Sequence, residues 1–184
     1  MLSLQDIEAL FNRRGHEQYA GEPVTQLEHA LQTAALAEAE GSDDELVTAC
    51  LLHDLGHLLH DLGSGEQSPT LRGVDDVHQH TSLPFLRRSF GARVLGGIQL
   101  HVDAKRYLCA TVPGYEAGLS ADSQRSLKLQ GGVFDALQAA AFIAKAGAVD
   151  AVQLRQWDDR AKVEHGATPP LSHFMQRAAR CALK

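Results

Sequence analysis

The stretch from Cys50 to His60, CLLHDLGHLLH, constrains the fold more than any other part of the sequence. His53, Asp54 and His57 stand there among five leucines, in a segment that we expect to be helical from Asp43 to His60. Residues four apart share a helix face, so His53 and His57 lie together and Asp54 flanks them. Polar side chains buried in an apolar helix are costly unless they are paired or bind metal. The stretch therefore predicts a metal site inside a helical core.

The composition favours an all-α fold. Hydrophobic residues make up 44% of the 184 residues. Ala and Leu are abundant and strand-favouring runs are scarce, which is typical of a helical globular protein. The length predicts a single domain over residues 1–184. Apolar residues at helical spacing predict further helices over Leu4–Arg14, Thr25–Glu40, Ala92–Cys109, Phe134–Lys145, Val149–Lys162 and about His173–Leu183.

Charge and cysteine content argue against several classes of function. The net charge is −6 and there is no basic run, which disfavours nucleic-acid binding through phosphate contacts. The three cysteines are widely spaced and form no CxxC motif, as is typical of reduced thiols in the cytoplasm. The N-terminus is not a signal peptide, and no apolar run reaches the roughly 20 residues of a membrane span. We therefore expect a cytoplasmic protein with no membrane partner; its oligomeric state stays open.

Two histidines after the central stretch compete for an inward position. His78 lines up with small and apolar residues at helical spacing, whereas His80 lines up with a mixed face. His78 is therefore the expected inward residue. Pro84 lies in the same helix and should kink it.

Three further donors come from other helices. His29 shares a face with Gln26, although a single histidine there would also suit a structural or surface position. His101 stands in the helix 92–109. Asp158 falls on an apolar face, where a carboxylate needs a partner, whereas Asp159 falls on the polar face and is expected to be solvated. Together with the central stretch, these donors suit a pair of metal ions such as iron, with Asp54 able to bridge them.

Four other side chains are candidates for substrate contacts, each with a plainer alternative. Lys105 shares a face with His101, which indicates an anion site beside a metal, or else a lysine in solvent. Ser123 in the first turn of a helix can help to hold an anion, or only satisfy its own helix end. Tyr19 and Glu22 stand in a Gly/Pro loop that could close over a pocket or be a simple surface loop.

Several stretches, in order along the chain, resemble one family. YAGEPVTQLEHALQ, LLHDLGH, HVDAKRYL, LQGG and LRQWDDRAK are similar to the HD-domain diiron oxygenases of organophosphonate catabolism. The resemblance covers roughly residues 16–163. HDLGH is generic to the HD-domain superfamily, most of whose members are phosphohydrolases, whereas the combination of YAGE, HVDAKRYL and LQGG is more specific. A minority of the superfamily are mixed-valent diiron oxygenases, related in fold to myo-inositol oxygenase.

The resemblance implies a fold, a reaction and a cofactor. The expected fold is a single HD-domain helical bundle with a dinuclear metal site in its core. The expected enzyme is a C–P bond-cleaving dioxygenase that uses O2 and a mixed-valent Fe(II)/Fe(III) pair. Its substrate would be a small phosphonate: 1-hydroxy-2-aminoethylphosphonate, giving glycine and phosphate, or its N-trimethyl analogue, giving glycine betaine and phosphate.

The resemblance also assigns roles residue by residue. One iron would be held by His29, His53, Asp54 and Asp158, and the other by the bridging Asp54 with His78 and His101. The catalytic residues would be His57 and Lys105. Substrate contacts would come from Tyr19, Glu22, Gln26, His57, Lys105 and Ser123. Lysine and histidine suit a phosphonate, and an aromatic ring with a carboxylate suits an ammonium group.

Two positions depart from the family pattern. The third metal-binding histidine of the family is usually followed by Glu, whereas Gln79 follows His78 here, and Pro84 is unexpected in that helix. Both differences leave His80 open as the ligand.

Two other functions remain as hypotheses. A divalent-metal phosphohydrolase acting on a small phosphate ester or nucleotide would use the same ligands, with a metal-activated water as nucleophile. The YAGE and KRYL stretches favour the oxygenase. A non-catalytic HD-like module that binds a small anion would not need the intact ligand set. The methylation state of the substrate amine is left open.

Overall fold

The protein is all-α in the part of the chain that its computed structural model describes, which is every residue except 20, 60–68, 76 and 184. The two pairings of extended backbone there are the isolated bridges Gln18–Thr25 and Phe90–Ala182. The helices are α1 (Leu4–Arg14), α2 (Gln26–Ala39), α3 (Asp44–Leu52), α4 (Leu55–Leu59), η1 (Pro69–Arg72), α5 (His78–Thr81), α6 (Leu83–Leu86), α7 (Ala92–Thr111), α8 (Tyr115–Gly118), α9 (Ala121–Leu129), α10 (Ala136–Ile143), α11 (Ala148–Arg160) and α12 (Leu171–Cys181).

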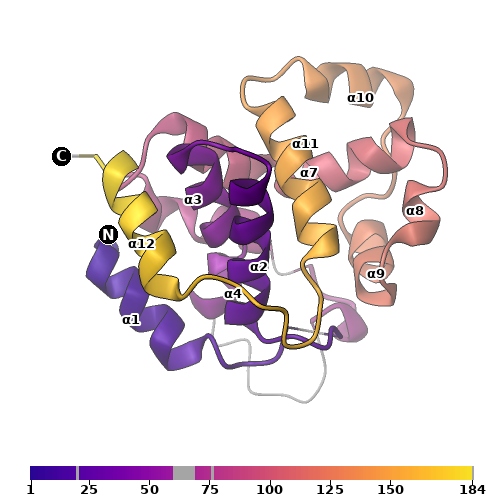
Figure 1. Ribbon diagram of the computed structural model, residues 1–184. Coiled ribbons are helices and arrows are strands. Elements are labelled where there is room, and N and C mark those ends of the chain that lie inside the picture. The colour runs from indigo at the N-terminus through magenta and orange to yellow at the C-terminus, as the bar shows by residue number, and fades with distance from the viewer. Residues whose placement is uncertain (20, 60–68, 76, 184) are drawn as a thin grey trace.

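The helices pack around α3 and the long helix α7 (Figure 1). α2, α7 and α12 all contact α3, and α11 runs against α7. α1 and α12 contact each other, which places the two ends of the chain on the same side of the bundle. Most buried apolar side chains of these helices form one continuous core. The polar site described below lies inside this bundle.

Side-chain caps set the starts of several helices. Ser3 and Thr25 each form the reciprocal capping box with an acidic residue three positions later. The sequence also predicts a box between Ser42 and Glu45, and this prediction is wrong. Asp43 caps α3 instead, because its carboxylate accepts the Leu46 N–H at 3.1 Å.

The expected continuous helix from Asp43 to His60 is interrupted. α3 ends at Leu52, a turn holds His53 and Asp54, and α4 follows; His60 lies outside the described residues. In an unbroken helix the two side chains would point about 100° apart. The turn instead lets both reach the same interior point. α4 also lies very close to α5, since a Cβ on Gly56 would stand only 2.1 Å from the His78 carbonyl oxygen.

The segment after residue 77 is bent, as the proline predicts. α5 and α6 are separate short helices that meet at Ser82, and Pro84 stands in the first turn of α6, where its missing N–H costs nothing. Val77 precedes α5 with φ at +46°, a left-handed conformation that is strained for a β-branched residue. His78 is buried and His80 is exposed, as the helical spacing predicts.

Two further expectations concern membranes and thiols. No helix of the described residues is both long and apolar enough to cross a membrane. The three cysteines, Cys50, Cys109 and Cys181, are free thiols.

Candidate metal centre

Six buried side chains gather into two neighbouring groups of potential metal ligands. Within each group, one donor atom from every residue lies within 4.8 Å of the others. The donors come from α2, the α3–α4 turn, α5, α7 and α11, so the fold brings together segments 129 residues apart in sequence, from position 29 to position 158. The first group consists of His29, His53 and Asp158, and the second of Asp54, His78 and His101.

Asp54 lies between the two groups and faces both. Its Oδ2 atom is 3.3 Å from the Nε2 atom of His53 and 3.6 Å from that of His29. Its Oδ1 atom is 3.2 Å from the Nε2 atom of His78 and 3.5 Å from that of His101. One carboxylate therefore presents a separate oxygen to each group, which is the arrangement that a bridging ligand requires.

Three of the imidazole rings are held in a defined orientation by the backbone. The Nδ1 atom of His29 is 2.8 Å from the Ala161 carbonyl oxygen, and that of His53 is 2.8 Å from the Cys50 carbonyl oxygen. The Nδ1 atom of His101 is 2.7 Å from the Ile98 carbonyl oxygen. A carbonyl only accepts, so each Nδ1 carries the proton and each Nε2 presents a lone pair inward. Backbone or carboxylate partners of this kind usually orient metal-binding histidines.

The inward atoms would repel one another without a cation between them. The Nε2 atoms of His29 and His53 are 3.2 Å apart, and those of His78 and His101 are 3.1 Å apart. Asp54 Oδ2 and Asp158 Oδ1 are buried and have no hydrogen-bond donor among the described residues. Buried polar atoms normally have a partner. Converging nitrogen and carboxylate donors therefore fit two borderline divalent or trivalent metal ions.

Opposite charges keep the two carboxylates ionised in spite of their burial. Burial raises the pKa of Asp54, but the neighbouring imidazoles of His53 and His78 more than reverse this increase, and the net pKa lies well below its usual value. Asp158 behaves in the same way: burial raises its pKa, and the guanidinium of Arg155 more than reverses this shift. Both groups are therefore anionic, as metal ligands must be.

A buried arginine supports Asp158 from behind. Arg155 is 5% exposed, and its Nη1 atom is 2.8 Å from Asp158 Oδ2. Arg155 also forms an ion pair with Asp159, and the Tyr115 hydroxyl donates a hydrogen bond to Asp159. The expectation that Asp159 is solvated is thus wrong. Asp159 compensates the second side of a buried guanidinium, which would otherwise be left partly unpaired.

Tyr19 lies beside the first ligand group, and His57 lies beside the second. The His57 ring stacks on His78 with ring centroids 4.1 Å apart, and its Nε2 atom is 3.9 Å from Asp54 Oδ1. The Tyr19 ring stacks on His29, also at 4.1 Å, and meets the His57 ring edge-on at 6.3 Å. Burial raises the pKa of Tyr19 well above its usual value, and the charges of Asp54 and Asp158 add to the increase.

Lys105 is not a solvent-exposed lysine, because only 2% of the residue is exposed. Its Nζ atom donates to Ser126 Oγ at 2.6 Å, and Ser126 Oγ in turn donates to the Ser123 carbonyl oxygen at 3.0 Å. Burial, followed by the nearby Arg155 charge, lowers the pKa of Lys105 to about 7. Ser123 is 9% exposed, and its own N–H bonds to the cap residue Ser120. Lys105 of α7 therefore meets Ser126 of α9, one helical turn after Ser123.

The two remaining candidates differ in position. Glu22 forms an ion pair with Lys162, with Oε1 and Nζ 2.8 Å apart, so its carboxylate already has a cationic partner. Gln26 begins α2, and its side chain makes no hydrogen bond to the two ligand groups among the described residues. A glutamine one turn before His29 shares its helix face, and here it is the half-buried first residue of α2.

Comparison with known sequences places this architecture in a family. The sequence profile of the HD domain matches residues 27–139, a span that includes five of the six donors. The chain belongs to the HD-domain family. The prediction of an all-α HD domain is therefore confirmed.

Characterised relatives of this HD-domain protein include two named enzymes. The [1-hydroxy-2-(trimethylamino)ethyl]phosphonate dioxygenase (glycine-betaine-forming) of Leisingera caerulea is 39% identical over 168 residues, which are 91% of this chain and 84% of the relative. The hydroxymethylphosphonate dioxygenase of Gimesia maris is 42% identical over 165 residues, 90% of this chain and 81% of the relative. An uncharacterized protein of Acanthamoeba polyphaga mimivirus is 30% identical over 166 residues.

Sequence reasoning about this HD domain overlooked Arg155, Ser126 and Lys162. In the helix expected over Val149–Lys162, Arg155 and Lys162 share a polar face with Asp159, which is the usual sign of a solvated surface; α11 in fact ends at Arg160, and Lys162 lies beyond it. Their burial depends on what packs against that face, and a single sequence does not show this. Ser126 gave a weak signal: it follows Ser123 by three residues and so lies on the same face of α9.

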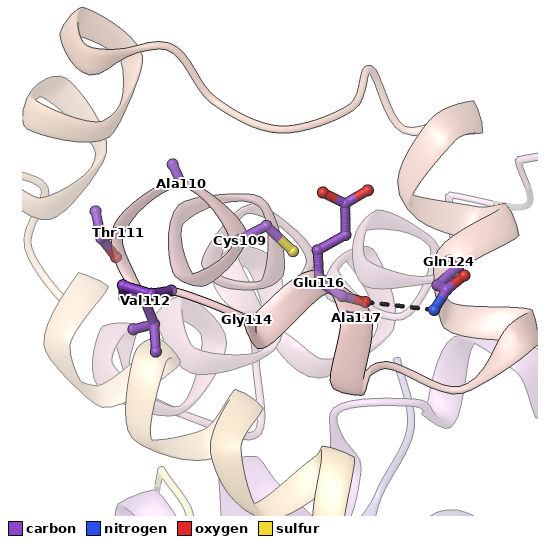
Figure 2. Close-up of a pocket in the computed structure, with 9 residues that line it drawn as sticks. Cys109, Ala110, Thr111, Val112, Gly114, Glu116, Ala117 and Gln124 are labelled. Atoms are coloured by element: carbon purple, nitrogen blue, oxygen red, sulfur yellow. Dashed lines mark hydrogen bonds between the residues drawn. The ribbon is translucent and has the colours of Figure 1, made fainter.

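The HD domain also has an open pocket on its surface, of about 690 Å³ (Figure 2). It lies where the end of α7 turns into α8 and the start of α9. Gln124 spans part of its wall and donates to the carbonyl oxygens of Glu116 and Leu119 at 3.4 and 3.1 Å. The lining residues are Cys109, Ala110, Thr111, Val112, Pro113, Gly114, Glu116, Ala117 and Gln124.

Proposed function

We propose that this protein is a metal-dependent dioxygenase that cleaves the C–P bond of a small 1-hydroxyphosphonate with O2 and releases phosphate. The observation that supports the proposal is the pair of ligand groups with Asp54 between them, together with the buried Lys105 one helical turn after His101 in α7. The relatives named as phosphonate dioxygenases support the same reaction, since each aligns with about nine tenths of this chain.

The ligand set divides naturally between two iron ions in our proposal. His29, His53, Asp54 and Asp158 would hold one iron, and Asp54, His78 and His101 the other. A mixed-valent Fe(II)/Fe(III) pair would supply O2 activation and a Lewis acid for the substrate oxygens. The group containing His78 has one protein donor fewer, and one side of it faces His57, so it is the better place for substrate to bind.

The remaining residues would bind and orient the substrate. His57 and Lys105 offset the phosphonate charge as hydrogen-bond donors, and Ser123 adds a hydroxyl at the start of α9. Tyr19 covers His29 and reduces access of water to the ligand groups. Glu22 would attract an ammonium group where the substrate carries one.

Three substrates are worth testing because they differ at one end of the molecule. The two aminated ones are 1-hydroxy-2-aminoethylphosphonate and its N-trimethyl analogue, which would give glycine and glycine betaine. The name of the Gimesia maris relative adds hydroxymethylphosphonate, which carries no cation. Oxidation of its C1 carbon by O2 with loss of phosphate balances to formate.

Phosphate release by the iron-loaded protein tests the proposal, measured on all three substrates with and without O2. We expect release from at least one substrate only when O2 is present, with one O2 consumed per phosphate. The proposal is wrong if none of them reacts. Oxygen-independent release of phosphate from simple phosphate esters would instead assign the protein to the hydrolytic branch of HD domains.

A further inference from the structure

Lys162 is the one cation that contacts both the α1–α2 loop, residues 15–25, and the start of α9 in the part of the chain that the structure describes. Its Nζ atom is 2.8 Å from Glu22 Oε1. The same atom is 3.3 Å from the hydroxyl oxygens of Ser120 and Ser123, and it lies 5.9 Å from the centroid of the Tyr19 ring. Lys162 therefore contacts or approaches residues that we assign to both ends of a substrate.

The position of Lys162 is fixed by its neighbours in the chain. The preceding carbonyl, of Ala161, bonds to His29 Nδ1 at 2.8 Å. The following residue, Val163, is held by the side-chain amide of Gln32, which accepts its N–H at 3.0 Å and donates to its carbonyl at 2.8 Å. The backbone around Lys162 is thus anchored to α2 on both sides. Its side chain projects from this anchored segment toward the loop.

The loop is in turn seated against α9. Gly21 adopts a left-handed conformation with φ at +76°, and a Cβ there would lie 3.2 Å from the Cβ of Asp122. The Glu22 N–H closes a turn on the Tyr19 carbonyl at 3.0 Å, and the Tyr19 N–H bonds to Val24 at 2.9 Å. The Glu22–Lys162 ion pair is a charged contact that joins this loop to the segment that follows α11. Its side chains are only 8% and 12% exposed, so neither charge is well solvated.

A poorly solvated ion pair is costly to break unless both charges find new partners. A zwitterionic substrate would offer both, since its ammonium suits Glu22 and its phosphonate suits Lys162. The hydroxyls of Ser120 and Ser123 already lie within hydrogen-bonding distance of Lys162. Ser123 is one of the residues that we assign to the phosphonate. A substrate without a cation offers a partner to Lys162 alone, and Glu22 then competes with that substrate for the lysine.

We propose that Lys162 is a substrate-binding residue that contacts the phosphonate together with Ser123 and exchanges Glu22 for it when the substrate brings its own cation. This inference rests on the function proposed above. It makes Glu22 a specificity-determining residue whose effect on binding differs in direction between two substrate classes. Glu22 strengthens the binding of an aminated phosphonate and weakens the binding of one without an amine.

Binding of methylphosphonate tests the exchange without any turnover, because this probe carries no hydroxyl and no amine. Titration calorimetry on the iron-loaded protein should show at least tenfold weaker binding for Lys162→Met and near wild-type binding for Lys162→Arg. Glu22→Gln should bind methylphosphonate several times more tightly than wild type, because Lys162 no longer pairs with a carboxylate. Lys128→Met removes an exposed charge from α9 and is the matched control, expected to bind as wild type does.

The same variants are then compared on an aminated substrate. Here Glu22→Gln should raise KM at least tenfold, the opposite direction to its effect on methylphosphonate. If the ion pair only fastens the loop, Glu22→Gln and Lys162→Met will change binding in the same direction on both ligands, and the proposal is overturned. If no hydroxyphosphonate releases phosphate, calorimetric binding of the aminated substrate replaces KM in this comparison; opposite effects of Glu22→Gln on the two ligands would then support the exchange while the proposed oxygenase reaction fails.

Discussion

The buried ligand cluster and the surface pocket differ in almost every property that matters for chemistry. The pocket has volume, about 690 Å³, and most of its lining side chains are small; the Gln124 amide in its wall donates to the carbonyl oxygens of Glu116 and Leu119. The cluster is defined instead by its chemistry, because it holds six titratable donors and two carboxylate oxygens without a hydrogen-bond partner among the described residues. Two of the buried oxygens without a hydrogen-bond partner among the described residues therefore belong to the ligand cluster.

This difference shows that unsatisfied, pre-oriented donors identify a site better than empty space does. Burial of each ordered imidazole in the cluster costs folding free energy, because its Nε2 atom loses contact with water. A bound metal would offset this cost by taking the lone pair of that atom. The surface pocket contributes no residue to either group of potential metal ligands found among the described residues. The predictions below test whether the two regions differ in function as they differ in structure.

Removal of Asp54, the carboxylate that we propose as the bridge, should have the largest effect. In Asp54→Ala each ligand group loses the oxygen that faces it, at 3.3 Å from His53 and 3.2 Å from His78. We expect metal content to fall below one ion per chain and turnover to become undetectable. Metal analysis after desalting, alongside the phosphate assay, measures both. A variant that retains two ions and full activity would show that Asp54 is not the bridge.

Substitution of the two histidines of α5, His78 and His80, should have very different effects on metal content and activity. His78 is buried with its Nε2 atom 3.1 Å from that of His101, whereas His80 is exposed. His78→Ala should lose about half of the bound metal and nearly all activity, because only the second group is broken. His80→Ala is the matched control and should keep both. Comparable losses in the two variants would reopen the choice between them.

Lys105 should affect substrate binding more than turnover. Its pKa of about 7 means that it is charged below this pH and loses its charge as the pH rises through it. The kcat/KM for hydroxymethylphosphonate should therefore fall above about pH 7 in wild type. Lys105→Met should lower kcat/KM about tenfold or more at acidic pH, the cost of a charge-assisted hydrogen bond, and remove this descending limb. Identical pH profiles for the two proteins would exclude Lys105 as the charged contact.

Changes in the surface pocket should have the smallest effects. Glu116 is exposed and its side chain projects into the pocket in Figure 2. Glu116→Gln should change kcat/KM by less than about twofold and stability by about 0.5 kcal/mol or less, as is usual for surface positions. Steady-state kinetics and thermal unfolding check both values. A tenfold loss of activity would mean that the pocket takes part in the reaction.

Local sequence patterns predicted the fold class, most helices and all six members of the ligand cluster. Periodicity separated His78 from His80 and placed Asp158 inward, because each is a property of one helix. The break at His53 and Asp54 escaped prediction, because it depends on the close approach of α4 to α5 at Gly56. The pairing of Glu22 with Lys162 spans 140 residues and depends on how the loop packs against α11. Such long-range contacts are set by tertiary structure and leave no local signal.

The spin state of the bound iron tests the central claim most directly, namely that the two groups form one centre bridged by Asp54. The measurement is electron paramagnetic resonance of the iron-loaded protein after partial reduction. Our account predicts that the wild-type protein gives the signal of a coupled mixed-valent pair in place of the signal of isolated ferric ions. It also predicts that this coupled signal disappears in Asp54→Ala. Iron that gives only the signal of isolated ferric ions in the wild-type protein would contradict a bridged dinuclear centre.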